Sequence, residues 1–318
     1  MKTVLITGAT SGLGLSTAKA LAGQGVRVLV GARKMPLAES VAAELRALGS
    51  PEAAPVELSL GSFADVRAGA ARVKQALAGA PLDGLDCNAG LQQVAATRRT
   101  PDGFEETFAV NHLAHLLLLC LLWDELAGGR VLFIGSGTHD LAQVKGAFGF
   151  RGAQWLGVAA AARGDTVPGT AQDQAGKDRY ANSKLANIVS AFELARRLKP
   201  AELVALALDP GLMGGTGLSR DHGLLERVSF AALQWLVPLM PGGSSPARSG
   251  AVAAYMLTDP ELASRSGTYL DSRRHEAAAS AQARDPALAR ALLDDSLALL
   301  GLGASELPRA LRGPAAPG

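Results

Sequence analysis

Tyr180 and Lys184 have the spacing of a proton-transfer pair. They are four residues apart in the stretch YANSK, so a helix would place both side chains on one face. A phenol with an ordinary pKa of about 10 is a poor proton donor near neutral pH, but a neighbouring ammonium stabilises the phenolate and lowers that pKa. The pair could therefore give a proton to a carbonyl that accepts a hydride, or take one from an alcohol. The same spacing also occurs on ordinary helix surfaces.

Ser136 ends the apolar run RVLFIGS, which begins at Arg130 and is typical of a buried strand. A serine hydroxyl at the end of a strand can hydrogen-bond a substrate oxygen and hold it against the phenol. The alternative is a serine that only caps the strand.

Glycines follow the first predicted strand in the stretch TGATSGLG. Glycine lets the backbone turn tightly and approach a pyrophosphate, which the free N–H groups at a helix N-terminus then bind. An ordinary tight turn is the alternative, but the position between a strand and a helix favours a dinucleotide site. Its predicted binding residues are Gly8, Thr10, Ser11, Gly12, Leu13 and Gly14.

Arg33 and Lys34 come directly after the second predicted strand. An NAD site has an acidic residue there for the ribose 2′-hydroxyl, whereas an NADP site has arginine near the 2′-phosphate. No carboxylate is present, and one would repel a phosphate. We therefore predict that Arg33, helped by Lys34 and Ser11, selects NADP(H). The alternative is that the two cations are a solvated pair.

The elements that must position these residues follow the pattern of repeated βαβ units, because short apolar runs alternate with Ala-rich and Leu-rich segments of helical period. This pattern predicts an α/β fold, a Rossmann-type doubly wound parallel sheet of about seven strands with helices on both faces. The predicted strands are Thr3 to Thr7, Arg27 to Gly31, Pro55 to Leu60, Leu82 to Asn88, Arg130 to Ser136, Leu203 to Asp209 and Gly267 to Leu270. The predicted helices are Leu13 to Gln24, Pro36 to Leu48, Phe63 to Leu77, Phe104 to Leu126, Asp178 to Leu198 and Ser245 to Thr258.

Residues 1–304 are predicted to form a single catalytic domain. Residues 139–177 interrupt the βα rhythm as a long, weakly patterned insert. Residues 212–243 contain an apolar segment that is either a lid over the substrate or a surface helix with one buried face. The Pro-rich, Gly-rich tail 305–318 is predicted to be disordered.

Composition excludes several classes of function. The 31 basic and 29 acidic residues are spread along the chain and give a formal charge of +2, so a nucleic-acid partner is not expected. Neither the five histidines nor Cys87 and Cys120 have metal-ligand spacing, so no metal is expected. The sequence predicts no membrane-spanning segment and no secretory leader, and we expect a cytoplasmic protein.

The motifs TGATSGLG and YANSK resemble those of the short-chain dehydrogenase/reductase family. Three further stretches extend the resemblance from Lys2 to about Leu270, namely CNAG at 87–90, VNH at 110–112 and DPG at 209–211. The resemblance implies catalytic roles for four residues: Ser136 positions the carbonyl, Tyr180 exchanges the proton, Lys184 lowers the pKa of the phenol and binds the nicotinamide ribose, and Asn111 supports a water-linked proton relay. It places Asn88, Ala89 and Gly90 beside the cofactor, and Pro210 and Gly211 beside the nicotinamide.

The chain departs from the family pattern at two cofactor positions. Ser59, followed by Leu60, stands where the family usually has an acidic residue near the adenine. After the PG turn the usual threonine position is Gly215, and Thr216 is the nearest threonine. We expect Ser59, Leu60, Leu212 and Thr216 to contact the cofactor nevertheless.

Within the family, GAR after the second strand, the VNHLAH segment and the long insert resemble the branch of retinol dehydrogenases and protochlorophyllide reductases. The expected activity is therefore hydride transfer between NADP(H) and a small apolar carbonyl or alcohol, with His139, Leu212 and Met213 near the substrate. Light-dependent reduction of a protochlorophyllide-type double bond is an alternative, although Leu212 replaces the functional cysteine of that enzyme. A non-catalytic NADP(H) sensor is a third hypothesis. The resemblance also allows a homo-oligomer assembled through helices 104–126 and 178–198.

Overall fold

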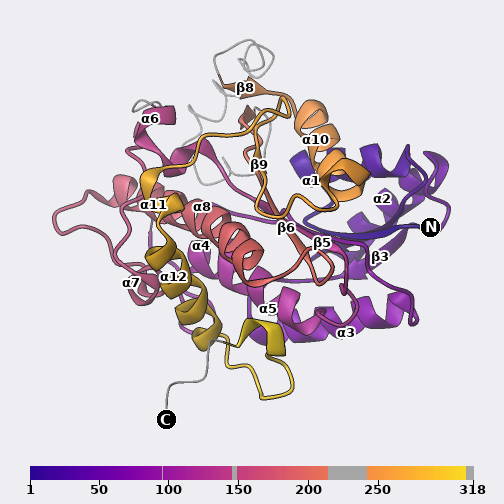
Figure 1. Cartoon of the computed structure of the whole chain (residues 1–318), viewed down its shortest axis with the longest axis horizontal. Helices are drawn as coiled ribbons and strands as arrows, with labels where there is room; N and C mark the ends of the chain where they lie inside the picture. Colours follow the sequence, from indigo (N-terminus) through magenta and orange to yellow (C-terminus); the bar gives the residue numbers. More distant parts are fainter. Residues whose placement is uncertain (95, 145–148, 214–241, 313–318) are drawn as a thin grey trace.

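Seven parallel strands form the central sheet of the protein (Figure 1). The computed structural model describes residues 1–94, 96–144, 149–213 and 242–312. The spatial order of the strands is β3, β2, β1, β4, β5, β6, β9, which confirms the predicted Rossmann-type fold. Their bounds are β1 Thr3–Thr7, β2 Arg27–Ala32, β3 Ala54–Glu57, β4 Gly84–Cys87, β5 Arg130–Ile134, β6 Val204–Leu208 and β9 Tyr269–Leu270.

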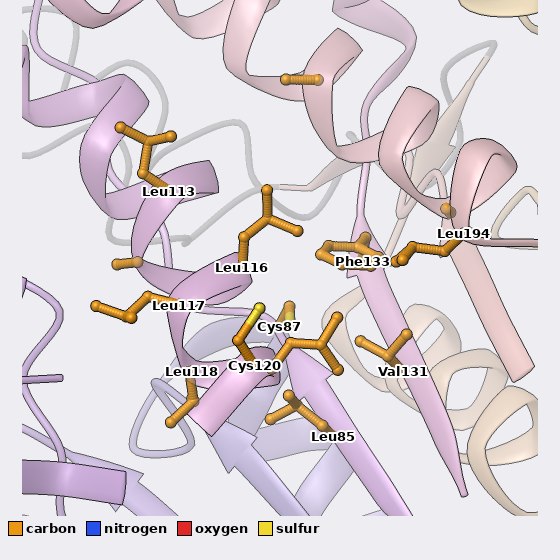
Figure 2. Packing of buried hydrophobic residues seen from close by; sticks show 14 of the residues in the cluster. Leu85, Cys87, Leu113, Leu116, Leu117, Leu118, Cys120, Val131, Phe133 and Leu194 are labelled. Carbon is orange, nitrogen blue, oxygen red and sulfur yellow. The ribbon is translucent and has the colours of Figure 1, made fainter. Parts of the chain in front are cut away.

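Helices cover both faces of the sheet, because successive residues of each strand point to opposite sides. On β1, Val4 and Ile6 belong to one buried apolar cluster and Leu5 to the other. The first cluster lies under α1 (Gly12–Ala22), α2 (Met35–Ala47) and α10 (Pro246–Thr258), and the second under α3 (Phe63–Leu77), α5 (Ala114–Leu121) and α8 (Gln172–Arg197). Figure 2 shows part of the second cluster, in which Leu116 of α5 lies near Phe133 of β5 and Cys120 of α5 lies beside Cys87 of β4.

The ligand crevice of this fold is set by the strand order. From β1 the chain builds the sheet outward to β2 and β3, and then returns to add β4 on the other side of β1. The loops that leave β1 and β4 therefore diverge at the carboxyl edge of the sheet, and an open α/β sheet binds its ligand at such a point.

The prediction of a single helix over residues 104–126 is wrong. The apolar stretch 104–126 forms α4 (Glu106–Phe108), a π-helical turn η1 (Ala109–Leu113) and then α5. The Asn111 side chain supports the irregular turn by bonding the backbone of Leu91 in both directions, at 2.8 and 2.9 Å. π-Helical turns are common at functional sites.

The insert is packed against α8, the helix that contains Tyr180 and Lys184. It contains the short elements η2 (Gly137–His139), α6 (Leu141–Val144) and α7 (Val158–Arg163), and α8 begins at Gln172 rather than at Asp178. Arg151 donates two hydrogen bonds to the buried carboxylate of Asp178, at 3.1 and 2.6 Å. Such a bidentate, charge-assisted pair holds the insert against the helix that carries Tyr180.

The C-terminal region is more ordered than predicted. After η6 (Pro260–Leu262) and α11 (Ala281–Arg284), helix α12 (Pro286–Leu299) lies against α8, where Asp294 accepts a hydrogen bond from Arg197 at 2.6 Å. Residues 305–312 were predicted to be disordered, but they include η7 (Arg309–Leu311), and Leu311 is 2% exposed. Two leucines, 307 and 311, pack on the core, a contact that composition alone does not reveal. Residues 313–318 lie outside the described part of the chain.

α12 also contacts η1, so it lies over helices through which a homo-oligomer was expected to assemble. Its Ser296 hydroxyl is 3.0 Å from Nε2 of His112. The homo-oligomer stays a prediction. The candidate lid 212–243 lies almost wholly outside the described residues, which include only β7 (Leu212–Met213), Gly242 and the first residue of β8 (Gly243–Ser244). Among the helices that the structure describes, none is both long enough and apolar enough to cross a bilayer.

Asp86 is a buried acid in the middle of the sheet. It is fully buried on β4, and neither carboxyl oxygen has a hydrogen-bond partner among the described residues. Its register neighbours Ile6 and Leu132 belong to the apolar cluster under α1 and α10. Burial raises the pKa of Asp86 to about 8, so this carboxyl is neutral at physiological pH.

We expect the substitution Asp86→Val to stabilise the protein increasingly as the pH rises. The folded pKa lies above the unfolded value of about 3.9, so the native state holds a proton that the unfolded chain releases. The wild-type protein should thus lose up to about 1.4 kcal/mol of unfolding free energy per pH unit between about pH 4 and pH 8. Urea unfolding at a series of pH values measures this slope. The slope should persist in the control Asp124→Asn, an exposed acid, and an equal slope in Asp86→Val would contradict the assignment.

Candidate active site

The glycine-rich turn after β1 is shaped by close backbone approaches. Gly8 and Gly12 have φ angles of +68° and +56°, which favour glycine. At Gly14 a Cβ atom would lie 2.4 Å from Nδ2 of Asn88 and 2.7 Å from the Gly8 carbonyl oxygen. Asn88 in turn donates to the carbonyl of Thr7 at 2.7 Å. The turns after β1 and β4 are therefore fastened together, as the predicted cofactor site requires.

The N-terminus of α1 fits an anionic group. Its N-cap residue Ser11 makes no side-chain cap hydrogen bond, and its first turn contains no acidic residue. The first N–H groups of the helix and the positive end of its dipole are therefore left for a ligand. Together with the tight turn that Gly8 and Gly12 allow, this end of the helix fits the pyrophosphate of a dinucleotide.

Arg33 and Lys34 stand beyond the end of β2, and both side chains are exposed. Within the described part of the chain, neither forms an ion pair. Ser59, in the place of the usual acid, donates from its hydroxyl to Asp65 on α3 at 3.2 Å, so a carboxylate from another element lies beside this position. Leu60 is 6% exposed.

Three predicted catalytic side chains meet where the chain leaves β5 and α8 passes beside it: Ser136 follows β5, and Tyr180 and Lys184 lie within α8. The phenol of Tyr180 hydrogen-bonds the Ser136 hydroxyl, and the ammonium of Lys184 lies 5.5 Å from the centre of the Tyr180 ring. Ser136 lies at the N-cap of η2 and also accepts a hydrogen bond from the backbone N–H of Thr138 at 3.2 Å. This arrangement is suited to passing a proton to an oxygen held by the serine.

Burial shifts the pKa values of Tyr180 and Lys184 in opposite directions. Burial raises the pKa of Tyr180 above its ordinary value, with the Asp209 charge as a second cause and the hydrogen bond from Ser136 acting against them. Burial lowers the pKa of Lys184 to about 8, against the attraction of Asp209. Lys184 donates to the Ile134 carbonyl at 3.0 Å, and Asn187 donates to the same oxygen at 3.0 Å. The pKa of Lys184 therefore lies close to neutral pH, and a further decrease would leave the side chain uncharged.

Asn111 lies beside the lysine in the π-helical turn. It donates to the Ser183 hydroxyl at 3.0 Å in addition to its bonds with Leu91. A Cβ atom on Gly90 would lie 3.2 Å from Oδ1 of Asn111 and 3.9 Å from Nζ of Lys184. The backbone carbonyl of Asn111 accepts from His115, whose other ring nitrogen is 2.9 Å from the Thr7 hydroxyl. Asn88, Gly90, Asn111 and Lys184 therefore converge; the water-linked relay stays a prediction.

The PG turn after β6, Pro210–Gly211, also has little room for a side chain. Gly211 has a φ of +71°, and a Cβ atom there would lie 2.8 Å from the Gly242 carbonyl oxygen. Leu212 and Met213 follow in β7 and are half-buried. Thr216, the predicted carboxamide contact, lies outside the described residues.

His139 is buried in the turn that carries Ser136, and its contact with substrate stays a prediction. It is 1% exposed, and both ring nitrogens are used within the protein: Nδ1 faces the Ser136 carbonyl at 2.7 Å and Nε2 accepts from the backbone N–H of Ser280 at 3.2 Å. Burial lowers its pKa, so the ring is neutral. His139 therefore fixes the turn that carries Ser136.

Sequence reasoning missed two residues that line this site. Phe150, in the insert, lies with its ring 6.1 Å from that of Tyr180, and no local pattern singled it out. Asn187 shares the Ile134 carbonyl with Lys184. Its position three residues after the lysine, on the same helix face, was a usable signal.

Comparisons with known proteins show the family of the chain. Residues 2–147 match the family model described as short chain dehydrogenase. The chain is 34% identical to protochlorophyllide reductase A of Oryza sativa subsp. japonica, covering 94% of this chain and 80% of the relative. It is 32% identical to retinol dehydrogenase 13 of Homo sapiens, covering 95% and 86%, and 34% identical to polyprenol dehydrogenase of Mus musculus, covering 96% and 85%.

Solved structures show the same fold. A 3-ketoacyl-(acyl-carrier-protein) reductase from Brucella melitensis, complexed with NADH, has a TM-score of 0.60 at 26% identity and covers 85% of this chain and 96% of its own. A short chain dehydrogenase from Burkholderia cenocepacia J2315, in complex with NADP, has a TM-score of 0.61 at 26% identity and covers 85% and 95%. The chain belongs to the short-chain dehydrogenase/reductase family of oxidoreductases, as its motifs predicted, and its relatives include both branches named from the sequence.

The substitution Gly14→Ala should weaken NADPH binding by about tenfold or more, because its methyl group displaces Asn88 and distorts the turn after β1. Gly23→Ala is a matched control, since a Cβ atom there has no heavy atom nearer than 3.6 Å. Fluorescence titration with NADPH measures both variants, and thermal unfolding checks that they fold. Unchanged affinity in Gly14→Ala would show that the cofactor does not lie over this turn.

Proposed function

We propose that the protein is an NADP(H)-dependent oxidoreductase that transfers a hydride between the nicotinamide and an apolar carbonyl or alcohol. The observation that carries the proposal is the contact of Ser136, Tyr180 and Lys184 beside a dinucleotide-shaped turn. A non-catalytic NADP(H) sensor would have no need of that contact.

The proposed roles divide the chemistry between three side chains. NADPH supplies the hydride when it is bound. Ser136 holds the substrate oxygen, and Tyr180 gives that oxygen the phenol proton during reduction or takes a proton from it during oxidation. Lys184, as an ammonium, favours the phenolate. Burial, which raises the pKa of Tyr180, acts in the opposite direction.

The choice of NADP(H) over NAD(H) rests on Arg33 and Lys34. Both are exposed beyond the end of β2, and no carboxylate in the stretch GARK competes for the ribose hydroxyls. A guanidinium matches the geometry of a phosphate with paired N–H donors. The two solved relatives differ, since one is complexed with NADH and the other with NADP, so the family alone leaves this choice open.

An apolar substrate is supported by what surrounds the phenol. Phe150 lies against the Tyr180 ring, and Leu212 and Met213 follow the PG turn half-buried. Retinol and polyprenol, named in two relatives, are alcohols on long apolar chains. Protochlorophyllide reductases are similarly related, so light-driven reduction of a chlorophyll-precursor double bond is the second candidate function.

The substitution Tyr180→Phe should lower kcat by about 100-fold or more and leave NADPH affinity unchanged, because it removes only the exchangeable proton. The assay uses NADPH with a panel of apolar carbonyls and, separately, protochlorophyllide. Each reaction is followed in light and in darkness. Turnover only in light would favour the second candidate. Tyr255→Phe, on α10, is the matched control, and retained activity in Tyr180→Phe would refute the mechanism.

The substitution Arg33→Ala should reduce the preference for NADPH over NADH by about 10- to 100-fold, the value of a charge-assisted phosphate contact. The ratio of kcat/KM for the two cofactors measures this preference. Arg309→Ala removes an exposed arginine from η7 and should leave the ratio unchanged. An equal ratio in Arg33→Ala and wild type would remove the basis for choosing NADP(H).

A further inference from the structure

Asp209 is an acidic residue at the edge of the site that none of the proposed roles uses. It follows β6 directly, precedes Pro210, and its backbone N–H donates to the Leu270 carbonyl at 2.8 Å. Its side chain is half-buried. The carboxyl group at this strand end is close enough to Tyr180 and Lys184 for its charge to act on both.

The carboxyl of Asp209 joins two turns of the site. Oδ1 accepts a hydrogen bond from the backbone N–H of Gly211 at 2.9 Å. The backbone N–H of Gly137 also donates to this carboxyl, and Oδ2 lies 3.2 Å from the place that a Cβ atom on Gly137 would occupy. One side chain thus connects the turn after Ser136 with the turn predicted to border the nicotinamide. Two N–H donors favour its ionised form.

The charge of Asp209 acts on both members of the proton-transfer pair. It raises the pKa of Lys184 and, after burial, the pKa of Tyr180. The other titratable groups around it are His139 on η2, which is neutral, Tyr269 on β9, and Asp271, which follows β9. Its own pKa is raised by burial and by Asp271, against the two N–H donors and His139.

We propose that Asp209 is a positioning residue that connects the Ser136 turn to the Pro210–Gly211 turn and keeps the Lys184 ammonium protonated by its negative charge. The inference rests on the proposed function. Burial alone brings the lysine close to losing its proton at neutral pH, and a neutral amine would neither favour the phenolate nor bind the ribose as a cation. The cost is a less acidic phenol. Asp209 therefore moves the working pH range of the pair upward as a whole.

The test compares Asp209→Asn with Asp271→Asn, a matched control that removes an acid following the next strand in the sheet. Asparagine keeps one acceptor oxygen for the turn and removes the charge. Two quantities are measured between pH 6 and pH 10 with the full chain: kcat/KM for carbonyl reduction with NADPH, and NADPH affinity from fluorescence. In Asp209→Asn both should decline at a pH lower by about 0.5 to 1 unit, since removal of an anion lowers the pKa of lysine and phenol alike.

A role in structure alone would reduce activity at every pH without moving the decline. An unmoved decline in Asp209→Asn, or an equal shift in Asp271→Asn, overturns the proposal even if carbonyl reduction is observed. A shifted decline in NADPH affinity without carbonyl reduction by wild type supports Asp209 and refutes the proposed activity. Failure of wild type to bind NADPH overturns both.

Discussion

A buried ammonium has to remain charged beside a phenol, and much of the site depends on that constraint. Lys184 is 4% exposed, so the protein interior favours its neutral form. The Ile134 carbonyl accepts one of its N–H groups, and the Asp209 charge counteracts the effect of burial. Burial lowers the pKa of His115 to about 4, and the nearby positive charge of Lys184 lowers it as well, so the ring is neutral. The His115 ring therefore places no second positive charge beside Lys184.

Irregular backbone supplies most of the contacts around this lysine. The Ile134 carbonyl belongs to the last paired residue of β5, and it receives donors from two side chains of α8. The π-helical turn brings Asn111 against Leu91, and the turn after β5 is fixed by His139. Regular strands and helices form the frame, while their ends carry the polar groups, because only there are backbone N–H and C=O groups free to bind side chains or ligands.

Local sequence patterns predicted a helix or strand well where the apolar periodicity and the capping residues indicated the same bounds. Helix 63–77 has its predicted bounds because the Ser62 side chain accepts from the N–H of Asp65 and Ala78 ends the helix in a left-handed conformation. The stretch 104–126 was misread because an apolar run reports burial but not which carbonyl each N–H will reach. α12 was missed although Ala289, Leu292, Leu293 and Leu297 give it a buried face at helical spacing. Residues 305–312 were missed because their apolar partners lie on distant elements.

The sequence by itself determined the α/β fold class, the glycine turn and the spacing of Tyr180, Lys184 and Ser136, because these are read from periodicity and from neighbours along the chain. The tertiary structure alone decided the contacts between distant segments. It brought Asp209 to the Ser136 turn, Arg151 to Asp178, and Ser280 to His139. Such pairings depend on how the loops fold back over the sheet. The residues involved have no regular spacing in the sequence from which the contact could be predicted.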